Sequence, residues 1–560
     1  MLVRMLARGA LLLVISSISG LGFACSGAMG GGAFEGDKNP DPTTTEEDTG
    51  ASSEDAGEEP TPGSDTGSRS DSSPATDTGP GATPDTGPGT TPSDPPVSGL
   101  SLIPNLAITE VAVFQGVKVS VAKDGAKVTT HMADVIAGRE ALVRVYVSPK
   151  AGWTTRDVVG ELKLVSASGG TKTYSAAATP AAASTDATLT STINFNVPTG
   201  AFAVDTQYSV SLYAKSGATT GDTSGARYPA TGATESLGAV GTGETLKIKI
   251  VPIQYNADGS GRLPDTTAAQ VERYRKAFYA MYPAKNVEVT VRAPVPYASA
   301  ISANGSGFSS ALQSMVKLRQ TDGAAKDVYY YGAFAGAASF SNYCGGGCVT
   351  GLCGLLTYPS DATGRACVGV GFTGSDSANT AAHELGHAHG RAHAPCGTGD
   401  ADGKYPYSGG TLGSWGYDLV DKKLYSPTTY KDFMGYCSPT WISDYTFKAI
   451  ATRMSTVSGS AFISVSKSAP TKYRFVDVGM DGKLAWGDSL TLNEPPLAEP
   501  HTVSYLGADG STVETTTGFY YPYEDLPGGY MLVPELPLSA RGIAVAGFAP
   551  SIETRLFKLP

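Results

Sequence analysis

The sequence predicts a multidomain protein in which an α+β domain at residues 245–456 lies between two all-β, sandwich-like domains at residues 99–244 and 457–560. Three observations lead to this fold class. The chain has 560 residues, a length that allows three or four domains. Short apolar runs separated by Gly, Asp and Ser turns fill both flanking regions. Only the central region combines such runs with apolar stripes of helical spacing.

The N-terminus, residues 1–25, resembles a secretion signal. Arg4 and Arg8 precede a short apolar run at residues 10–15, which small residues follow. The run is too short to span a membrane as a helix. The residues before Cys25 resemble the lipobox of bacterial lipoproteins, which implies lipidation of Cys25. We therefore expect an exported protein that a lipid holds at the outer membrane or cell surface, or that ordinary cleavage releases to the extracellular space.

Residues 26–98 are expected to form a disordered linker. Pro, Gly, Ser, Thr, Asp and Glu dominate, so the segment cannot bury enough apolar area to fold. It carries 15 acidic and 2 basic side chains, whereas the formal net charge of the whole chain is −11. The folded part is therefore close to neutral and has no basic excess for nucleic acid. We expect a monomer that binds no nucleic acid and meets a membrane only through its lipid anchor.

Both flanking regions contain strand patterns of the length that β-sandwiches use. The first region is expected to form an immunoglobulin-like sandwich. Its expected strands lie at residues 108–114, 141–147, 162–165, 193–197 and 208–213. The expected strands of the second region lie at residues 462–465, 473–478, 502–506 and 542–546. The sequence leaves the role of the first region open between a spacer, a substrate-docking module and an inhibitory pro-segment.

The central region alternates between strand and helix patterns. Its expected strands lie at residues 246–250, 287–291, 327–334 and 367–372. An apolar stripe predicts a helix that Asp265 or Thr266 would cap. The stripe consists of Val271, Tyr274, Phe278 and Met281. A second helix is expected around residues 312–316, and a last one at residues 443–454.

Four of the six His of the chain lie in one stretch, HELGHAHGRAH, at residues 383–393. Residues four apart on a helix share one face, so His383 and His387 can bind one metal ion. Gly390 can end the helix in the left-handed conformation and bring back His393 as a third ligand. Three His leave one position of a tetrahedral Zn²⁺ open for water, which is typical of catalytic sites.

Glu384 follows the first His without being forced to bind the metal. This position suits a general base, which takes a proton from zinc-activated water and passes it to the leaving amine. A helix is expected here, because residues 378–385 lack Pro and Gly and residues 375–377 offer capping side chains. His389 should face away from the metal, beside the site or at the surface, because it lies only two positions after His387.

The stretch resembles the extended zinc motif, HExxHxxGxxH, of the metzincin superfamily of zinc endopeptidases. That family also has a Met-turn beneath the zinc, and the matching residue here is Met434, 41 residues after His393. The order Met434-Gly435-Tyr436 is similar to the turn of the astacin and serralysin branches. By that resemblance, Tyr436 is a further zinc ligand that moves to stabilise the transition state. The branch itself stays unassigned.

The resemblance covers residues 245–455 and implies a metzincin-like catalytic domain. In that family an edge strand of the sheet pairs with the substrate backbone, and here it should lie between residues 335 and 366. The resemblance implies a zinc metalloendopeptidase with one catalytic Zn²⁺ and protein or peptide substrates. A zinc peptidase or amidase for cell-wall peptides would use the same residues. An adhesion lipoprotein with a relic zinc fold is the non-enzymatic alternative, against which the intact Glu384 argues.

Besides Cys25, the chain has six Cys, and all six lie in the central region. An even number in an exported protein predicts disulfides. The candidates are Cys344, Cys348, Cys353, Cys367, Cys396 and Cys437. One pairing is favoured, because Cys396 follows His393 by three positions and Cys437 follows Met434 by three.

Two Asp-containing stretches, residues 400–403 and 477–482, hint at Ca²⁺ binding. Neither has the number of ligands that a calcium loop requires. Ordinary Asp-Gly turns are the simpler interpretation of both.

Overall fold

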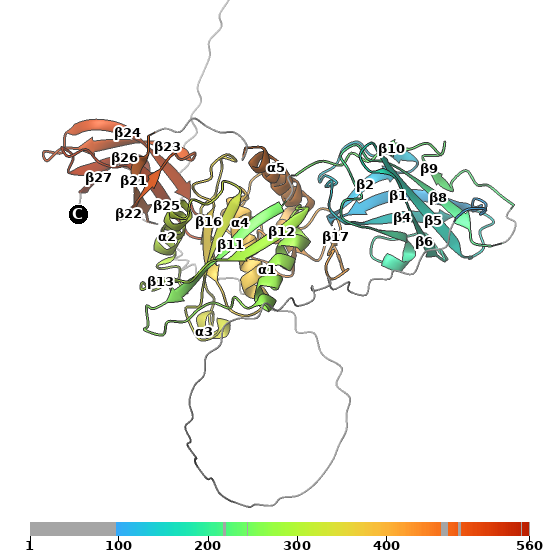
Figure 1. Cartoon of the computed structure of the whole chain (residues 1–560), viewed down its shortest axis with the longest axis horizontal. Coiled ribbons are helices and arrows are strands. Elements are labelled where there is room, and N and C mark those ends of the chain that lie inside the picture. Colours follow the sequence, from blue (N-terminus) through green and yellow to red (C-terminus); the bar gives the residue numbers. More distant parts are fainter. Residues whose placement is uncertain are drawn as a thin grey trace, which may run out of the picture.

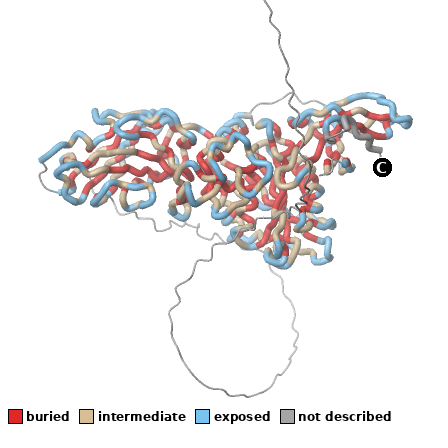
Figure 2. The backbone as a smooth tube through the Cα atoms, turned by 180° about the vertical axis from the view of Figure 1, so that it is seen from behind, coloured by how far each residue is buried: buried red, intermediate tan, exposed pale blue. Residues whose placement is uncertain are grey.

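The computed structural model describes residues 97–216, 220–242, 245–460, 469–479, 483–549 and 552–558. The expected signal with Cys25, most of the expected linker and the expected strand at residues 462–465 lie outside these ranges. The described chain is mostly β and forms several sheets, which fits a multidomain protein (Figure 1). One cluster of buried apolar side chains runs through all the regions, and Figure 2 shows the buried backbone that carries it. No described helix is long and apolar enough to cross a membrane.

Two sheets form the N-terminal region, and both contribute side chains to one core. The first contains β1 (Leu106–Phe114), β2 (Gly116–Lys123), β3 (Ala126–Lys127), β4 (Ala141–Pro149) and β7 (Ile193–Val197). The second contains β5 (Val158–Ser166), β6 (Gly170–Ala178), β8 (Gln207–Ala214), β9 (Arg227–Tyr228) and β10 (Glu235–Ser236). All five strands expected from the sequence are present. The edge strand β6 was not predicted, because most of its side chains are not buried and its sequence lacks a run of large apolar residues.

The first of these sheets is extended by strands from far along the chain. β17 (Gly416–Tyr417) pairs with β2, and β18 (Leu424–Tyr425) pairs with β17. The indole N–H of Trp441 also donates to the carbonyl of Gly116 over 2.8 Å. The N-terminal sheet is therefore joined by backbone hydrogen bonds to the segment that follows the His-rich stretch.

A six-stranded sheet organises the central region. Its strands are β11 (Thr245–Tyr255), β12 (Asn286–Val291), β13 (Val295–Tyr297), β14 (Val328–Phe334), β15 (Gly351–Cys353) and β16 (Ala366–Val370). They lie in the order β12-β11-β14-β16-β15, with β13 beside β11. Every pair is parallel except β15–β16. β15 is therefore an antiparallel edge strand, and it lies within residues 335–366, where the sequence could not place one.

Five α-helices lie in the described central region. They are α1 (Ala268–Met281), α2 (Phe308–Thr321), α3 (Phe340–Tyr343), α4 (Ser375–Ala388) and α5 (Asp444–Ser460). The predicted caps of α1 are wrong, because Thr267 caps it by accepting a hydrogen bond from the Gln270 N–H. The predicted caps of α4 are wrong as well. Gly374 is its N-cap and Ser375 already belongs to the first turn.

The C-terminal region forms one antiparallel sheet in the order β22-β21-β25-β24-β23-β26-β27. Its strands are β21 (Thr471–Val478), β22 (Leu484–Leu492), β23 (Glu499–Leu506), β24 (Thr512–Pro522), β25 (Gly529–Pro534), β26 (Gly542–Ala549) and β27 (Ile552–Lys558). Alternation sends Phe475 into the main core and Val476 into a separate core of the sheet itself. The strands thus form one continuous hydrogen-bonded sheet that contributes side chains to two cores.

Candidate active site

The end of α4 places three His side chains around one point. His383 and His387 lie one turn apart on the helix, as predicted. Gly390 then adopts a φ of +77°, and its N–H donates to the carbonyl of His387 over 2.8 Å. The next N–H, of Arg391, donates to the carbonyl of Gly386 over 3.0 Å. These two bonds close a Schellman motif, which reverses the chain and returns His393 to the helix face.

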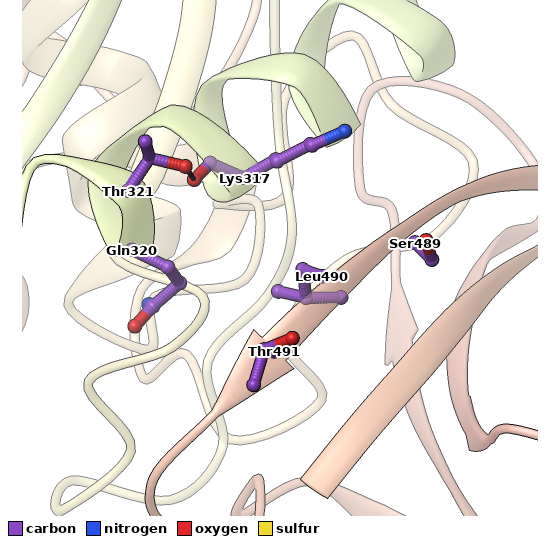
Figure 3. Close-up of a pocket in the computed structure, with 6 residues that line it drawn as sticks. All are labelled: Lys317, Gln320, Thr321, Ser489, Leu490 and Thr491. Carbon is purple, nitrogen blue, oxygen red and sulfur yellow. Dashed lines mark hydrogen bonds between the residues drawn. The ribbon is translucent and has the colours of Figure 1, made fainter. Parts of the chain in front are cut away.

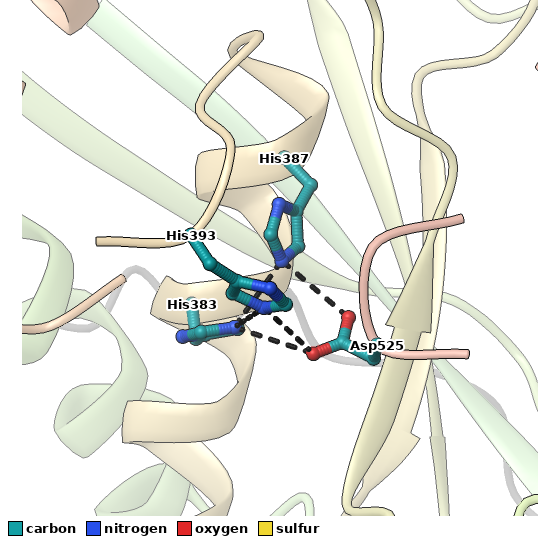
Figure 4. A group of neighbouring side chains, drawn as sticks. All are labelled: His383, His387, His393 and Asp525. Carbon is teal, nitrogen blue, oxygen red and sulfur yellow. Dashed lines mark hydrogen bonds and ion pairs between the residues drawn. The ribbon is translucent and has the colours of Figure 1, made fainter. Parts of the chain in front are cut away.

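The three imidazole Nε2 atoms converge (Figure 4). His383 Nε2 lies 3.2 Å from His387 Nε2 and 3.3 Å from His393 Nε2. Three nitrogens bound at 2.0–2.1 Å to a tetrahedral zinc would lie about 3.3 Å apart. The spacing therefore fits a zinc ion. With Asp525, these are the one group of three or more potential metal ligands among the described residues.

Backbone carbonyls orient two of the rings. His383 Nδ1 donates to the carbonyl of Phe433 over 2.8 Å, and His387 Nδ1 donates to the carbonyl of Arg391 over 2.6 Å. A carbonyl can only accept, so Nδ1 carries the proton and the Nε2 lone pair is free for a metal. Burial also lowers the pKa of His387 well below its usual value.

A tight turn holds Met434 against the zinc helix. The turn lies between two short parallel strands, β19 (Lys431–Asp432) and β20 (Thr440–Trp441). The buried carboxylate of Asp432 accepts from the N–H groups of Met434, over 2.8 Å, and Ser443, over 2.9 Å. The Met434 carbonyl accepts from Ala394 N–H over 3.0 Å, directly after the third His. Met434 therefore packs against Gly386 of α4 and pairs with the residue after the third His.

Glu384 is enclosed beside the cluster, with only 2 % of its surface exposed. Burial and the neighbouring Asp525 raise the pKa of Glu384 well above its usual range. Its side chain lies over the edge strand β15, since a Cβ built on Gly351 would be 2.5 Å from its carboxyl carbon. A carboxyl group at this position is of the type that serves as a general base or acid in hydrolysis.

Tyr436 lies beside the cluster of three His side chains. Its ring centre is 4.7 Å from that of His393 and 5.9 Å from that of His383. Its hydroxyl donates to Oδ1 of Asp525 over 2.8 Å. Burial, followed by the charge of Asp525, raises the pKa of Tyr436 above its usual value, so the phenol keeps its proton.

Sequence reasoning missed Asp525 altogether. This residue lies between β24 and β25, 132 positions after His393, and its side chain points into the His cluster (Figure 4). Burial alone would raise its pKa, but His387 and His383 hold the pKa of Asp525 well below its usual range. The local sequence, an acidic pair before Leu526 and Pro527, gives no signal of this contact.

His389 takes no part in the cluster. It faces away from it, as predicted, but it is buried rather than at the surface. Its ring stacks on Tyr329 at a centroid distance of 4.4 Å, and its Nδ1 donates to the carbonyl of Leu385 over 2.6 Å. Burial lowers the pKa of His389 to about 3. This His is therefore a neutral part of the core behind the helix.

All six candidate Cys form disulfides, which are Cys344–Cys348, Cys353–Cys367 and Cys396–Cys437. The last is the pairing that the sequence favoured. It joins the segment after His393 to the Met-turn, and the Tyr436 N–H donates to the Cys396 carbonyl beside it over 2.8 Å. The second bridge joins β15 to β16 across the edge of the sheet.

Asp side chains in the two suggested calcium-binding stretches already accept hydrogen bonds from other residues of the chain. Asp402 accepts from the guanidinium of Arg391 and from the hydroxyl of Tyr445, each over 2.9 Å. Asp477 accepts from the hydroxyl of Ser309. Asp481, in the second stretch, lies outside the described residues. These contacts favour turns and packing over Ca²⁺ ligation.

Comparison with known protein families gives a match that begins in the central region. Residues 350–475 match the model of the family Peptidase M66. No curated protein matches the chain significantly. The matched segment includes the three His, Glu384, Met434 and Tyr436, whereas Asp525 lies beyond it. Together, this match and the four-residue group support a zinc metallopeptidase, which implies protein or peptide substrates.

Proposed function

We propose that the chain is a metzincin-type zinc endopeptidase that cuts protein substrates. One observation carries the proposal: the Nε2 atoms of His387 and His393 lie 3.2 Å and 3.3 Å from that of His383, next to a buried glutamate on the same helix as His383. A bound Zn²⁺ would supply Lewis acidity and lower the pKa of a water molecule to about 7. The ligands would be His383, His387 and His393.

The side chains around the cluster suit the remaining steps of peptide hydrolysis. Glu384 accepts the proton of the attacking water and returns it to the amine as the C–N bond breaks. Tyr436 donates its phenolic proton in a hydrogen bond to the carbonyl oxygen as that oxygen gains negative charge. The raised pKa of Tyr436 suits a group that donates without losing its proton.

The edge strand β15 offers a backbone ladder for an extended substrate. It pairs with β16 on one side only, and Gly351 brings its backbone next to Glu384. An extended peptide on the free side would place a peptide bond beside the general base. This arrangement favours cleavage inside protein chains over attack on small amides.

We place this enzyme outside the cytoplasm. Three disulfides within the described residues suit an oxidising compartment. A signal at residues 1–25 with lipidation of Cys25 would anchor the enzyme, and residues 26–98 would act as its linker. It would act as a monomer without nucleic acid.

Casein digestion by the purified, zinc-loaded chain tests the peptidase function. We expect cleavage that a chelator abolishes and added Zn²⁺ restores. Glu384→Gln should retain zinc and lose nearly all activity. Glu288→Gln, at an exposed Glu on the far edge of the same sheet, is the matched control and should cleave normally. Equal cleavage by Glu384→Gln would contradict the proposal. So would casein left intact by both the wild-type chain and an Asp525→Ala variant.

A further inference from the structure

The Asp525 carboxylate lies where an open metal site would hold water or substrate. Its Oδ1 is 3.4 Å from His383 Nε2 and 3.3 Å from His393 Nε2. Its Oδ2 is 3.4 Å from His387 Nε2. The two oxygens together lie about as close to the three His nitrogens as the measured nitrogens lie to one another, so the carboxylate occupies the side of the His cluster where a fourth ligand would bind. Four protein ligands make a closed site, whereas a peptidase needs the fourth position free.

We propose that Asp525 is a fourth metal ligand and that the loop between β24 and β25, residues 523–528, closes the active site as an inhibitor built into the chain. The inhibitory role rests on the proposed peptidase function. The loop connects two strands of the C-terminal sheet and acts as a latch on the catalytic region. Substrate can enter only when the loop leaves the cluster.

The chain around this loop also pairs with the residues directly after the edge strand. The β24 strand ends in Pro522, whose carbonyl accepts from the Leu355 N–H over 2.8 Å. The next residue, Tyr523, forms an antiparallel bridge with Gly354, directly after β15. The chain's own backbone thus occupies the end of the edge along which an extended substrate would bind. This contact is independent of Asp525 and points to the same closed state.

The catalytic side chains are engaged rather than free. The Tyr436 hydroxyl, which hydrolysis would need for the substrate oxygen, is donated to Asp525. The exposed fractions are 2 % for Glu384, 0 % for His387 and 1 % for His393. A group this enclosed cannot receive a peptide in its present arrangement.

One edge of the interface between the C-terminal sheet and the catalytic region, which we call the seam, is polar and loosely packed. Between α2 and β22 lies an open cavity of about 300 Å³ that is lined mostly by polar side chains (Figure 3). Two ion pairs bridge the seam, Lys317–Asp488 and Lys326–Glu494, and all four side chains are at least 35 % exposed. Exposed ion pairs contribute little to stability, because solvent screens them. The edge of the interface at this cavity is therefore polar and loosely packed, whereas Phe475, Tyr521 and Tyr530 of the same sheet are buried in the core shared with the catalytic region. Opening therefore requires movement of the loop at residues 523–528 rather than release of the whole sheet.

Cobalt spectroscopy and chelation test the ligation without relying on activity. The full chain, Asp525→Ala and Asp525→Asn are compared. Asn keeps the shape of the side chain in case Ala disturbs folding. Asp509→Ala, in the exposed turn between β23 and β24, is the matched control. In both Asp525 variants we expect the visible spectrum of bound Co²⁺ to change and zinc release to a chelator to be at least about tenfold faster than in the full chain. Asp509→Ala should show neither change. An unchanged spectrum and release rate in both would overturn the proposal.

Closure is tested with a short peptide hydroxamate, a metal-chelating probe, and with casein. An open state populated at about 1–10 % predicts roughly 10- to 100-fold tighter probe binding and faster cleavage in Asp525→Ala. Slower cleavage with normal probe binding would overturn the latch. Suppose that neither protein cleaves casein while probe binding and the cobalt spectrum still change. The closed, Asp525-ligated site then stands, and the peptidase function alone fails.

Discussion

Gly386 on the zinc helix lies directly against the sulfur of Met434, leaving no room for a side chain: a Cβ built on Gly386 would be 2.3 Å from Sδ and 2.9 Å from Cε. The helix and the Met-turn thus meet at a point where only hydrogen fits. Gly386 is not one of the fixed positions of the zinc motif, so its identity here follows from this contact.

We expect Gly386→Ala to destabilise the protein by about 1–3 kcal/mol through overpacking, although Ala favours a helix by about 1 kcal/mol over Gly. The displaced Met-turn should also speed zinc release to a chelator. Gly459→Ala is the matched control, because Gly459 is on the exposed side of α5 with no atom within 4 Å of a built Cβ. Denaturant unfolding checks both, and a stabilised Gly386→Ala would show that the contact relaxes without penalty.

Gly351 has a similar relation to the general base. A Cβ on Gly351 would overlap the end of the Glu384 side chain. We expect Gly351→Ala to push the carboxylate aside, keep zinc, and lower kcat by about 100-fold, as misplacements near 1 Å do. Gly346→Ala, with open space around its Cβ, is the control. Zinc content and casein kinetics are the measurements, and unchanged kcat with zinc retained would refute this positioning.

The local part of the site could be predicted from the sequence. The helical period places His383 and His387 on one face, and Gly390 supplies the reversal that returns His393. The Cys396–Cys437 pairing followed from the same reasoning, because both segments must meet beneath the metal. Each of these inferences depends on short spacings that the backbone geometry fixes.

The long-range contacts could not be predicted. Asp525 reaches the cluster only because β24 and β25 pair in one register and dock on the edge of another sheet. β17 joins the N-terminal sheet for a similar reason. No residue spacing encodes such docking, since it depends on the packing of complete sheets. The predicted N-cap residues of α1 and α4 were wrong for a more local reason. Several neighbouring Ser, Thr and Asp residues could each have capped the helix, and the sequence does not distinguish between them.

The Cys396–Cys437 bridge should stabilise the protein more than the Cys344–Cys348 bridge. The first closes a loop of 41 residues and the second a loop of 4. Chain entropy then predicts a loss of about 4 kcal/mol for Cys396→Ala/Cys437→Ala and about 2 kcal/mol for the matched Cys344→Ala/Cys348→Ala. Only the first should also speed zinc release, since it anchors Tyr436 and the segment after His393. Equal losses and equal zinc retention would contradict this account.

Tyr436 should show two opposing roles that one variant cannot separate. Its hydroxyl stabilises the closed state through Asp525. In the open state we expect it to serve the substrate oxygen. Tyr436→Phe in the wild-type chain therefore weakens the latch and the chemistry together, and its effect on kcat should be small. In the Asp525→Ala chain the Tyr436 hydroxyl has no role in closing the site and only its role at the substrate oxygen remains. Tyr436→Phe should then lower kcat by about 100-fold with KM nearly unchanged.

A double-mutant cycle of these four chains measures the coupling between Tyr436 and Asp525. The comparison requires only casein kinetics and zinc content, because Phe keeps the ring beside His393. Tyr407→Phe removes a hydroxyl that bonds to Asp444 instead, and it serves as the control. If Tyr436→Phe reduces kcat equally in both backgrounds, the hydroxyl has no part in closing the site and acts on the substrate alone.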